Sequence, residues 1–206
     1  MAYVAGGMSF LPAVMGLMRY RKLNRAMRLF TAFTLVGSLS VTVEFGLGMF
    51  KITNYFLADI YYLASVLLLA LVYGWSVRPE AAQKVLKGCA VVYCFIWVID
   101  EICFPDLDQV NSTLAMISSI FLVMMSMVAL QALLKSARTS LTGEPVFWIL
   151  TGTILYSTGS FLVFGLSNDL LKLGLAYFDI AWHINWILYI ASMLMFTKGL
   201  LCKSQV

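Results

Sequence analysis

Seven long apolar stretches fill almost the whole chain and constrain its fold more than any other feature. Crossing a bilayer as a helix takes ~20 mostly apolar residues at 1.5 Å of rise each. The chain offers stretches near this length at residues 3–18, 29–50, 55–77, 88–104, 112–134, 146–167 and 180–201. Only 12% of its 206 residues are charged. We therefore expect an all-α polytopic membrane protein, in which residues 1–206 form a single seven-helix transmembrane domain.

The first stretch, 3–18, is the weakest of the seven because it is short and contains Pro12. Six crossings with a re-entrant or cleaved start is the alternative. Met1 to Tyr3 contains no Lys or Arg, and no clear small-residue cleavage site precedes Arg19, which argues against a signal peptide. We expect the first stretch to span.

The distribution of charge predicts an orientation. One ten-residue loop holds five of the fourteen basic residues, namely Arg19, Arg21, Lys22, Arg25 and Arg28. Basic loops stay on the cytoplasmic side, which places the N-terminus outside and the C-terminus inside. Alternate loops agree, with further bases inside at Arg78, Lys84, Lys87, Lys135, Arg138, Lys198 and Lys203, and outside only at Lys51 and Lys172. We expect a multi-pass protein of the cell (inner) membrane, whose basic charge reflects topology rather than nucleic-acid binding.

Acidic residues gather on the opposite side. Glu80 and Glu144 fall inside, and the others fall outside, at Glu44, Asp59, Asp100, Glu101, Asp106, Asp108, Asp169 and Asp179. Helical rise measured from the nearest inner base places Glu44 and His183 ~24 and ~22 Å up, and Asp100 with Glu101 ~20 Å up. Ionisable groups at such depth tend to face the bundle interior. Together with Asp59, they are expected to form one layer in the outer third of the membrane.

The last stretch adds aromatic rings to this layer. Asp179, Trp182 and Trp186 follow a helical spacing, and His183 lies four residues after Asp179. We expect an outward-facing pocket in which carboxylates and rings hold a cation or a polar ligand. Its predicted ligand-binding residues are Glu44, Asp59, Asp100, Glu101, Asp179, Trp182, His183 and Trp186. The alternative is that the tryptophans belong to the interfacial aromatic belt and the acids to outer loops.

Most membrane chemistries lack their residues in this chain. One histidine cannot supply a multi-histidine zinc site, and Lys198 lies at the inner end rather than at the mid-membrane position of a retinal Schiff base. We expect no catalytic, metal or cofactor site and favour a non-enzymatic role. Two alternatives stay open: a transporter or channel that uses Glu44, and a serine hydrolase in which Ser160 shares the depth of His183.

A pattern near the end of the chain resembles a known group. It consists of Glu144-Pro-Val-Phe-Trp148, Gly152, Tyr156, Gly159, Phe161, Phe164, Ser167, Asn168, Trp182, Asn185 and Tyr189. This resembles a group of uncharacterised small bacterial seven-helix membrane proteins, similar to the membrane modules of sensor histidine kinases, and Glu44 and Asn54 match positions in the same group. The resemblance implies a sensor or accessory module. The chain lacks a kinase domain, so the resemblance does not by itself imply signalling. We expect a module that responds to an outer-side ligand and passes the change to a protein partner at the basic loop of Arg19 to Arg28.

Overall fold

The computed structural model describes residues 2–50, 55–103, 112–136 and 141–202. These residues form α1 (Ala2–Met8), α2 (Phe10–Arg19), η1 (Tyr20–Lys22), α3 (Arg25–Met49), α4 (Tyr55–Ser76), α5 (Glu80–Cys103), α6 (Ser112–Ser136), η2 (Leu141–Gly143), α7 (Pro145–Leu173) and α8 (Leu175–Leu201). The all-α prediction is therefore confirmed for the described chain. Five charged residues that were used to predict the orientation lie outside the described residues, namely Lys51, Asp106, Asp108, Arg138 and Lys203. Asn54, which belongs to the family resemblance, also lies outside them.

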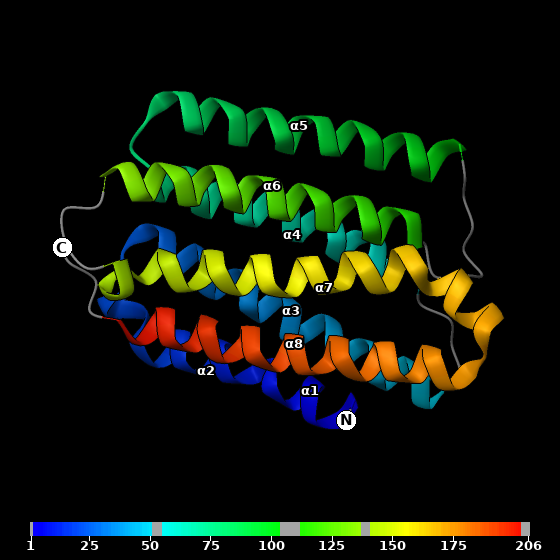
Figure 1. Cartoon of the computed structure of the whole chain (residues 1–206). Coiled ribbons are helices and arrows are strands. Elements are labelled where there is room, and N and C mark those ends of the chain that lie inside the picture. The colour runs from blue at the N-terminus through cyan, green and yellow to red at the C-terminus, as the bar shows by residue number, and fades with distance from the viewer. Residues whose placement is uncertain (1, 51–54, 104–111, 137–140, 203–206) are drawn as a thin grey trace.

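The long helices lie side by side and run lengthwise through the molecule (Figure 1). Contacts join α2, α3, α4, α6, α7 and α8 in that order, and α8 returns to α2, so these six helices surround a common interior. The helix α5 packs outside this ring, against α4 and α6. Large buried side chains fill the interior, and Phe30 meets Phe196 edge-on at 5.2 Å between ring centres.

Five helices of the described chain are long and apolar enough to cross a membrane. They cover Arg25–Met49, Phe56–Ser76, Ser112–Ser136, Pro145–Leu166 and Leu175–Leu201, and they correspond to five of the seven predicted stretches. The protein is therefore a helical membrane protein. The stretches 3–18 and 88–104 are not among the five. In α5 charged residues occupy both ends, and the uncharged part runs only from Gly88 to Ile99. The whole helix has 24 residues, so it is long enough to cross only with its charged ends at the two interfaces.

The first stretch is divided into two short helices at Ser9. Proline has no backbone N–H, so Pro12 leaves the carbonyl one turn earlier without its helical partner. The Ser9 hydroxyl donates to the Gly6 carbonyl oxygen at 2.7 Å, and the Ser38 hydroxyl donates to the Ser9 carbonyl oxygen at 2.9 Å. The break is thus stabilised by a hydrogen bond from α3.

Several helices extend beyond the apolar stretches that predicted them. Asn24 caps α3, since its side-chain oxygen accepts from the Met27 N–H at 2.9 Å. The expected loop between 167 and 180 is almost wholly helical, because Gly174 is the one residue of that segment at which the helix is interrupted. Gly174 has φ +124°, a conformation that other residues rarely adopt, and it separates α7 from α8.

Helices α7 and α8 approach closely at glycine positions. A Cβ added at Gly152 would lie 2.7 Å from the Phe196 ring, and one at Gly199 would lie 2.9 Å from the Pro145 carbonyl oxygen. Small residues permit such approach between membrane helices. This contact fixes the register of the two helices that carry much of the predicted site.

Candidate functional site

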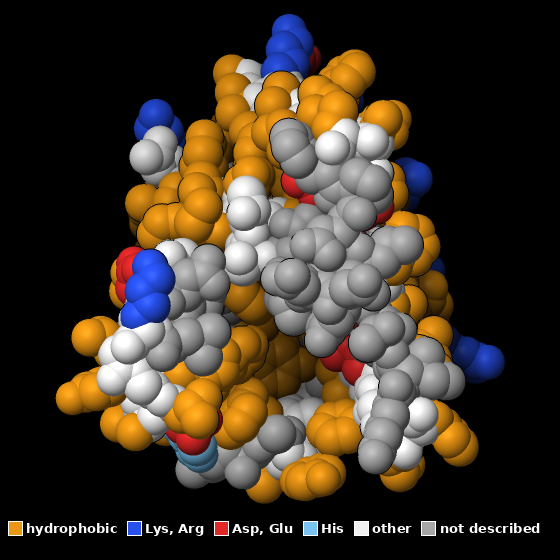
Figure 2. Space-filling view, turned by 90° about the vertical axis from the view of Figure 1, so that its right-hand side faces the viewer, with side chains coloured by type: hydrophobic (Ala, Val, Ile, Leu, Met, Phe, Trp, Pro, Cys, Tyr) orange, Lys and Arg blue, Asp and Glu red, His pale blue; other side chains and the backbone are white. Residues whose placement is uncertain are grey.

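Charged residues separate to the two ends of the bundle. We call the end formed by the last turns of α3, α5 and α7 and the first turns of α4 and α8 the acidic end; its acids are Glu44, Asp59, Asp100, Glu101, Asp169 and Asp179. The opposite end carries Arg19 to Arg28, Arg78, Lys84, Lys87, Lys135 and Lys198, and we call it the basic end. Figure 2 faces the acidic end and shows acidic side chains at several separate places and a hollow with hydrophobic walls.

Glu44 is exposed near the end of α3 rather than turned fully into the bundle, and half-buried tyrosines of three other helices lie near it. Its carboxylate accepts a hydrogen bond from the Ser40 hydroxyl at 3.1 Å. It also lies within electrostatic range of Tyr61, Tyr156 and Tyr189, which come from α4, α7 and α8. The carboxylate is therefore near side chains of three other helices, although its one hydrogen bond is to Ser40 of its own helix.

The tyrosine rings pack on one another. Tyr156 and Tyr189 meet edge-on with ring centres 5.2 Å apart, and Tyr62 lies close enough to Tyr156, Asp59 and Glu44 to interact electrostatically. We call Tyr61, Tyr62, Tyr156 and Tyr189 the tyrosine cluster. A cavity of about 20 Å³ lies beside it, with Tyr61 and Tyr189 in its lining; this exceeds the ~10–15 Å³ that one water needs.

Asp59, Asp100 and Glu101 form a second group between α4 and α5. Asp59 is only 6% exposed and lies within electrostatic range of the other two. The Trp97 indole N–H donates to the Asp59 carbonyl oxygen at 3.1 Å, which joins α5 to α4 at this level. Glu101 Oε1 is buried and has no hydrogen-bond partner among the described residues. The structure therefore brings these three of the predicted site residues together.

The predicted residues of α8 lie apart from these groups. Asp179 and His183 are exposed, and His183 Nδ1 donates to the Asp179 carbonyl oxygen at 2.6 Å rather than to its carboxylate. Trp186 packs on His183 with ring centres 5.0 Å apart, and Trp182 packs against Phe164 of α7 at 5.6 Å. These rings form a ridge along α8 and α7, as expected for an interfacial aromatic belt.

The predicted single layer thus consists of three groups in the structure. Glu44 joins the tyrosine cluster, Asp59 joins Asp100 and Glu101, and the α8 residues form the aromatic ridge. Sequence reasoning did not select Tyr61 and Tyr62, although they lie two and three residues after Asp59. One signal was present: Asn185, Tyr189 and Ser192 recur at spacings of four and three, which marks the interior face of α8.

Buried hydroxyls continue from the tyrosine cluster along α7. Thr153, Ser157 and Ser160 lie on one face of the helix and are at most 3% exposed. The Thr153 hydroxyl accepts from the Tyr73 hydroxyl at 2.9 Å, and the Ser160 hydroxyl donates to the Asn185 side-chain oxygen at 3.2 Å. Ser157 Oγ has no hydrogen-bond partner among the described residues. This polar stripe spans the middle of α7 and reaches towards the basic end at Thr153.

The described residues contain no group of three or more His, Cys, Asp or Glu side chains that could hold a metal ion. Ser160 faces the Asn185 side-chain amide, which is not a general base. His183 lies two residues from Asn185, about 200° around α8, and so points away from Ser160.

Comparisons of the chain with known protein families, characterised proteins and solved structures found no match.

Proposed function

We propose that this protein is a non-enzymatic sensor or accessory module of a bacterial inner membrane, with seven crossings, the N-terminus outside and the C-terminus inside. In this orientation the acidic end faces outward. The observation that carries the proposal is that the exposed carboxylate of Glu44 lies within electrostatic range of tyrosines from three other helices. A ligand there touches α3, α4, α7 and α8 together.

The chemistry of this site suits an organic cation. A carboxylate supplies the opposite charge, and the electron-rich faces of tyrosine rings attract ammonium groups. The buried hydroxyls of the tyrosine cluster add hydrogen-bond partners for a polar substituent. We therefore assign the ligand to the class of small ammonium compounds.

The response passes to the basic end through the helices that the ligand joins. Of the five bases predicted to meet a partner, three make contacts within the chain: Arg19 Nη1 donates to the Leu200 carbonyl oxygen at 2.7 Å, Arg25 lies over the Trp75 ring at 4.0 Å, and Arg28 Nε donates to a backbone oxygen at 2.9 Å. The other two, Arg21 and Lys22, are exposed. We assign the contact with an acidic partner protein to these two residues.

Thermal unfolding of the purified full chain tests the ligand class. The panel contains tetramethylammonium, choline, primary amines and 3,3-dimethylbutanol, an uncharged analogue of choline. A binding ligand at 100 times its Kd stabilises the folded state by about 2.7 kcal/mol, and we expect such shifts from ammonium compounds but not from dimethylbutanol. Glu44→Gln should remove the shift, whereas Asp169→Asn, which changes an exposed acid of the same end, should retain it. Equal shifts in both variants, or none across the panel, would contradict the assignment.

A transporter is the second candidate, and the polar stripe of α7 favours it. Thr153, Ser157 and Ser160 make the interior polar around the middle of α7, and Thr153 lies beyond Tyr156 towards the basic end. Flux of the ammonium compound into liposomes that contain the protein distinguishes the two functions. A sensor binds without flux, while a transporter shows flux that Glu44→Gln abolishes.

A further inference from the structure

A large cavity lies at the basic end, outside the site described above. Its volume is about 1120 Å³, and residues of α3, α4, α5 and the start of α7 line it. This exceeds the ~300–1,000 Å³ typical of pockets for drug-sized molecules. Both α3 and α5 pack on α4, and the cavity occupies the space that they flank.

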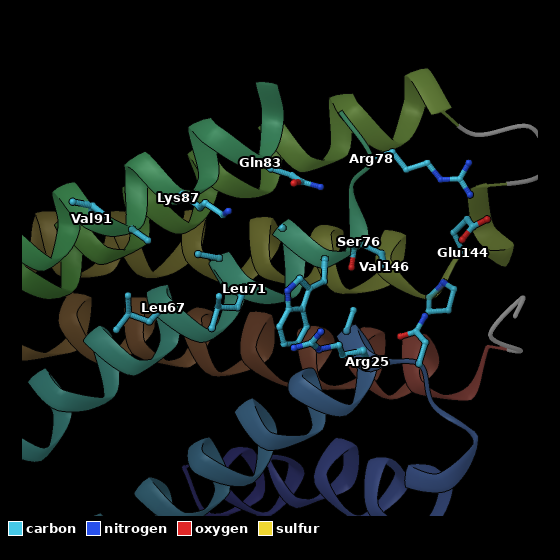
Figure 3. A pocket seen from close by; sticks show the side chains of 17 residues that line it. Arg25, Leu67, Leu71, Ser76, Arg78, Gln83, Lys87, Val91, Glu144 and Val146 are labelled. Carbon is cyan, nitrogen blue, oxygen red and sulfur yellow. The ribbon is translucent and has the colours of Figure 1, made fainter. Parts of the chain in front are cut away.

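The lining changes from charged to apolar along the cavity (Figure 3). Arg78 and Glu144 lie at the end nearest the helix termini, while Leu67 and Val91 lie at the other end, deeper along the helices. Leu71 lies between them on α4 and is 46% exposed. A ligand that fills this space needs a charged part and a long apolar part.

Positive charge dominates the polar part. The lining contains the cations Arg25, Arg78 and Lys87 and one acid, Glu144. The one ion pair within 4.0 Å in the described part of the chain is at the acidic end, so these cations are not paired with a described carboxylate. Arg25 is held over the Trp75 ring at 4.0 Å, which leaves the edge of its guanidinium able to donate. Guanidinium groups bind phosphate oxygens through two parallel hydrogen bonds.

We propose that this cavity binds one anionic phospholipid. The phosphate lies among Arg25, Arg78 and Lys87, and an acyl chain lies along the apolar wall of Leu67 and Leu71. Basic pockets between membrane helices favour anionic headgroups. With Glu144 included, the lining keeps an excess of positive charge, which a zwitterionic lipid with no net charge does not balance. A soluble phosphate compound would leave the apolar half of the cavity unfilled. The site is separate from the Glu44 site and does not depend on the proposed function.

Gly74 allows the cavity to be filled without disturbing the fold. It lines the cavity, and a Cβ added there meets no atom within 4 Å. Gly74→Leu therefore places a side chain in the lipid's space and also improves helix propensity. Gly88→Leu is the matched control, since Gly88 lies on α5, is equally open and does not line the cavity.

Native mass spectrometry of the full chain, released from detergent with added phosphatidylglycerol or phosphatidylcholine, measures binding. We expect one phosphatidylglycerol per chain, bound at least about 10-fold more tightly than phosphatidylcholine, from the charge difference at a three-cation site. Gly74→Leu should abolish this adduct, and Gly88→Leu should retain it. Equal binding of the two lipids, or equal behaviour of the two glycine variants, would overturn the proposal.

Charge variants provide a second readout. The double variant Arg25→Gln and Lys87→Gln should weaken phosphatidylglycerol binding by about 30-fold. Lys84→Gln with Lys135→Gln removes the same charge at the same end outside the cavity, and should weaken it by less than about threefold. Displacement of the lipid by inorganic phosphate alone would show a site for a free anion and would also overturn the proposal.

Discussion

Tyr73 and Tyr93 offer a matched test of the interior described here. Both side chains are fully buried. The Tyr73 hydroxyl donates to Thr153 Oγ1 at 2.9 Å and accepts from Ser126 Oγ at 3.1 Å. The Tyr93 hydroxyl lies near Ser118, but it forms no hydrogen bond of standard geometry among the described residues, and the Ser118 hydroxyl donates to the Ala115 carbonyl oxygen instead. Replacing each with phenylalanine removes one oxygen atom from the same kind of surroundings, so the hydrogen bonds alone distinguish the two variants.

The expected magnitudes follow from these contacts. Hydrogen bonds between membrane helices contribute about 0.6 kcal/mol each on average, and Tyr73→Phe also leaves the buried Ser126 hydroxyl without this acceptor. We expect the free energy of unfolding to fall by about 1 to 2 kcal/mol. The Tyr93 hydroxyl loses its hydrogen bonds to water when the protein folds and forms none of standard geometry in the interior, so Tyr93→Phe removes an unfavourable buried polar group. Its unfolding free energy should stay the same or rise by about 1 kcal/mol.

Reversible unfolding of the purified chain by SDS in mixed micelles, followed by circular dichroism, measures both values. A double-mutant cycle of Tyr73→Phe with Thr153→Val should give a coupling energy of about 0.5 to 1.5 kcal/mol. A loss for Tyr93→Phe as large as that for Tyr73→Phe, or no coupling in the cycle, would refute the assignment of partners.

Three further changes test the local packing in the same unfolding assay. Gly199→Ala should destabilise the protein by about 1 to 3 kcal/mol, because the added Cβ would lie 2.9 Å from a backbone oxygen. Gly74→Ala should stabilise it by up to about 1 kcal/mol, because a Cβ there meets no atom within 4 Å. If Gly74→Ala destabilised the protein more than Gly199→Ala, the close approach of α7 and α8 would be contradicted. Asn24→Ala removes the cap of α3 and should cost about 1 kcal/mol. Arg19→Gln removes the donor to the last carbonyls of α8 and should cost about 0.5 to 1 kcal/mol, with faster hydrogen exchange at the end of α8; unchanged exchange there would count against that contact.

The helical class and five of the predicted stretches follow from the sequence because both depend on local properties. A run of apolar residues that is long enough must form its hydrogen bonds internally in lipid. The separation of charge into two ends follows in turn, since alternate loops of antiparallel helices lie at the same end. Pro12 indicates that the first stretch is interrupted. The hydrogen bond that stabilises the break comes from Ser38, 29 residues later in the chain, and no local pattern predicts it.

The direction in which each side chain points could not be predicted in the same way. Residue counting gives height along a helix, and so it placed Asp59, Asp100 and Glu101 at one level. It does not give the rotation of the helix, which is set by contacts such as those of Gly152 and Gly199 between α7 and α8. For this reason His183 lies on the exposed side of α8, whereas Asn185 and Tyr189 face the interior. The cavity at the basic end depends on where α5 packs, which no local pattern encodes.

The central claim is that the acidic end, with Glu44 and the tyrosine cluster, faces outward and the basic end faces the cytoplasm. Two native thiols test it directly, because Cys103 ends α5 at the acidic end and Cys202 follows α8 at the basic end. Variants that retain one of these cysteines, with the other three changed to serine, are treated in intact cells with a membrane-impermeant maleimide. We predict labelling of Cys103 in intact cells and of Cys202 only after permeabilisation. Labelling of Cys202 in intact cells, with Cys103 protected, would contradict the account.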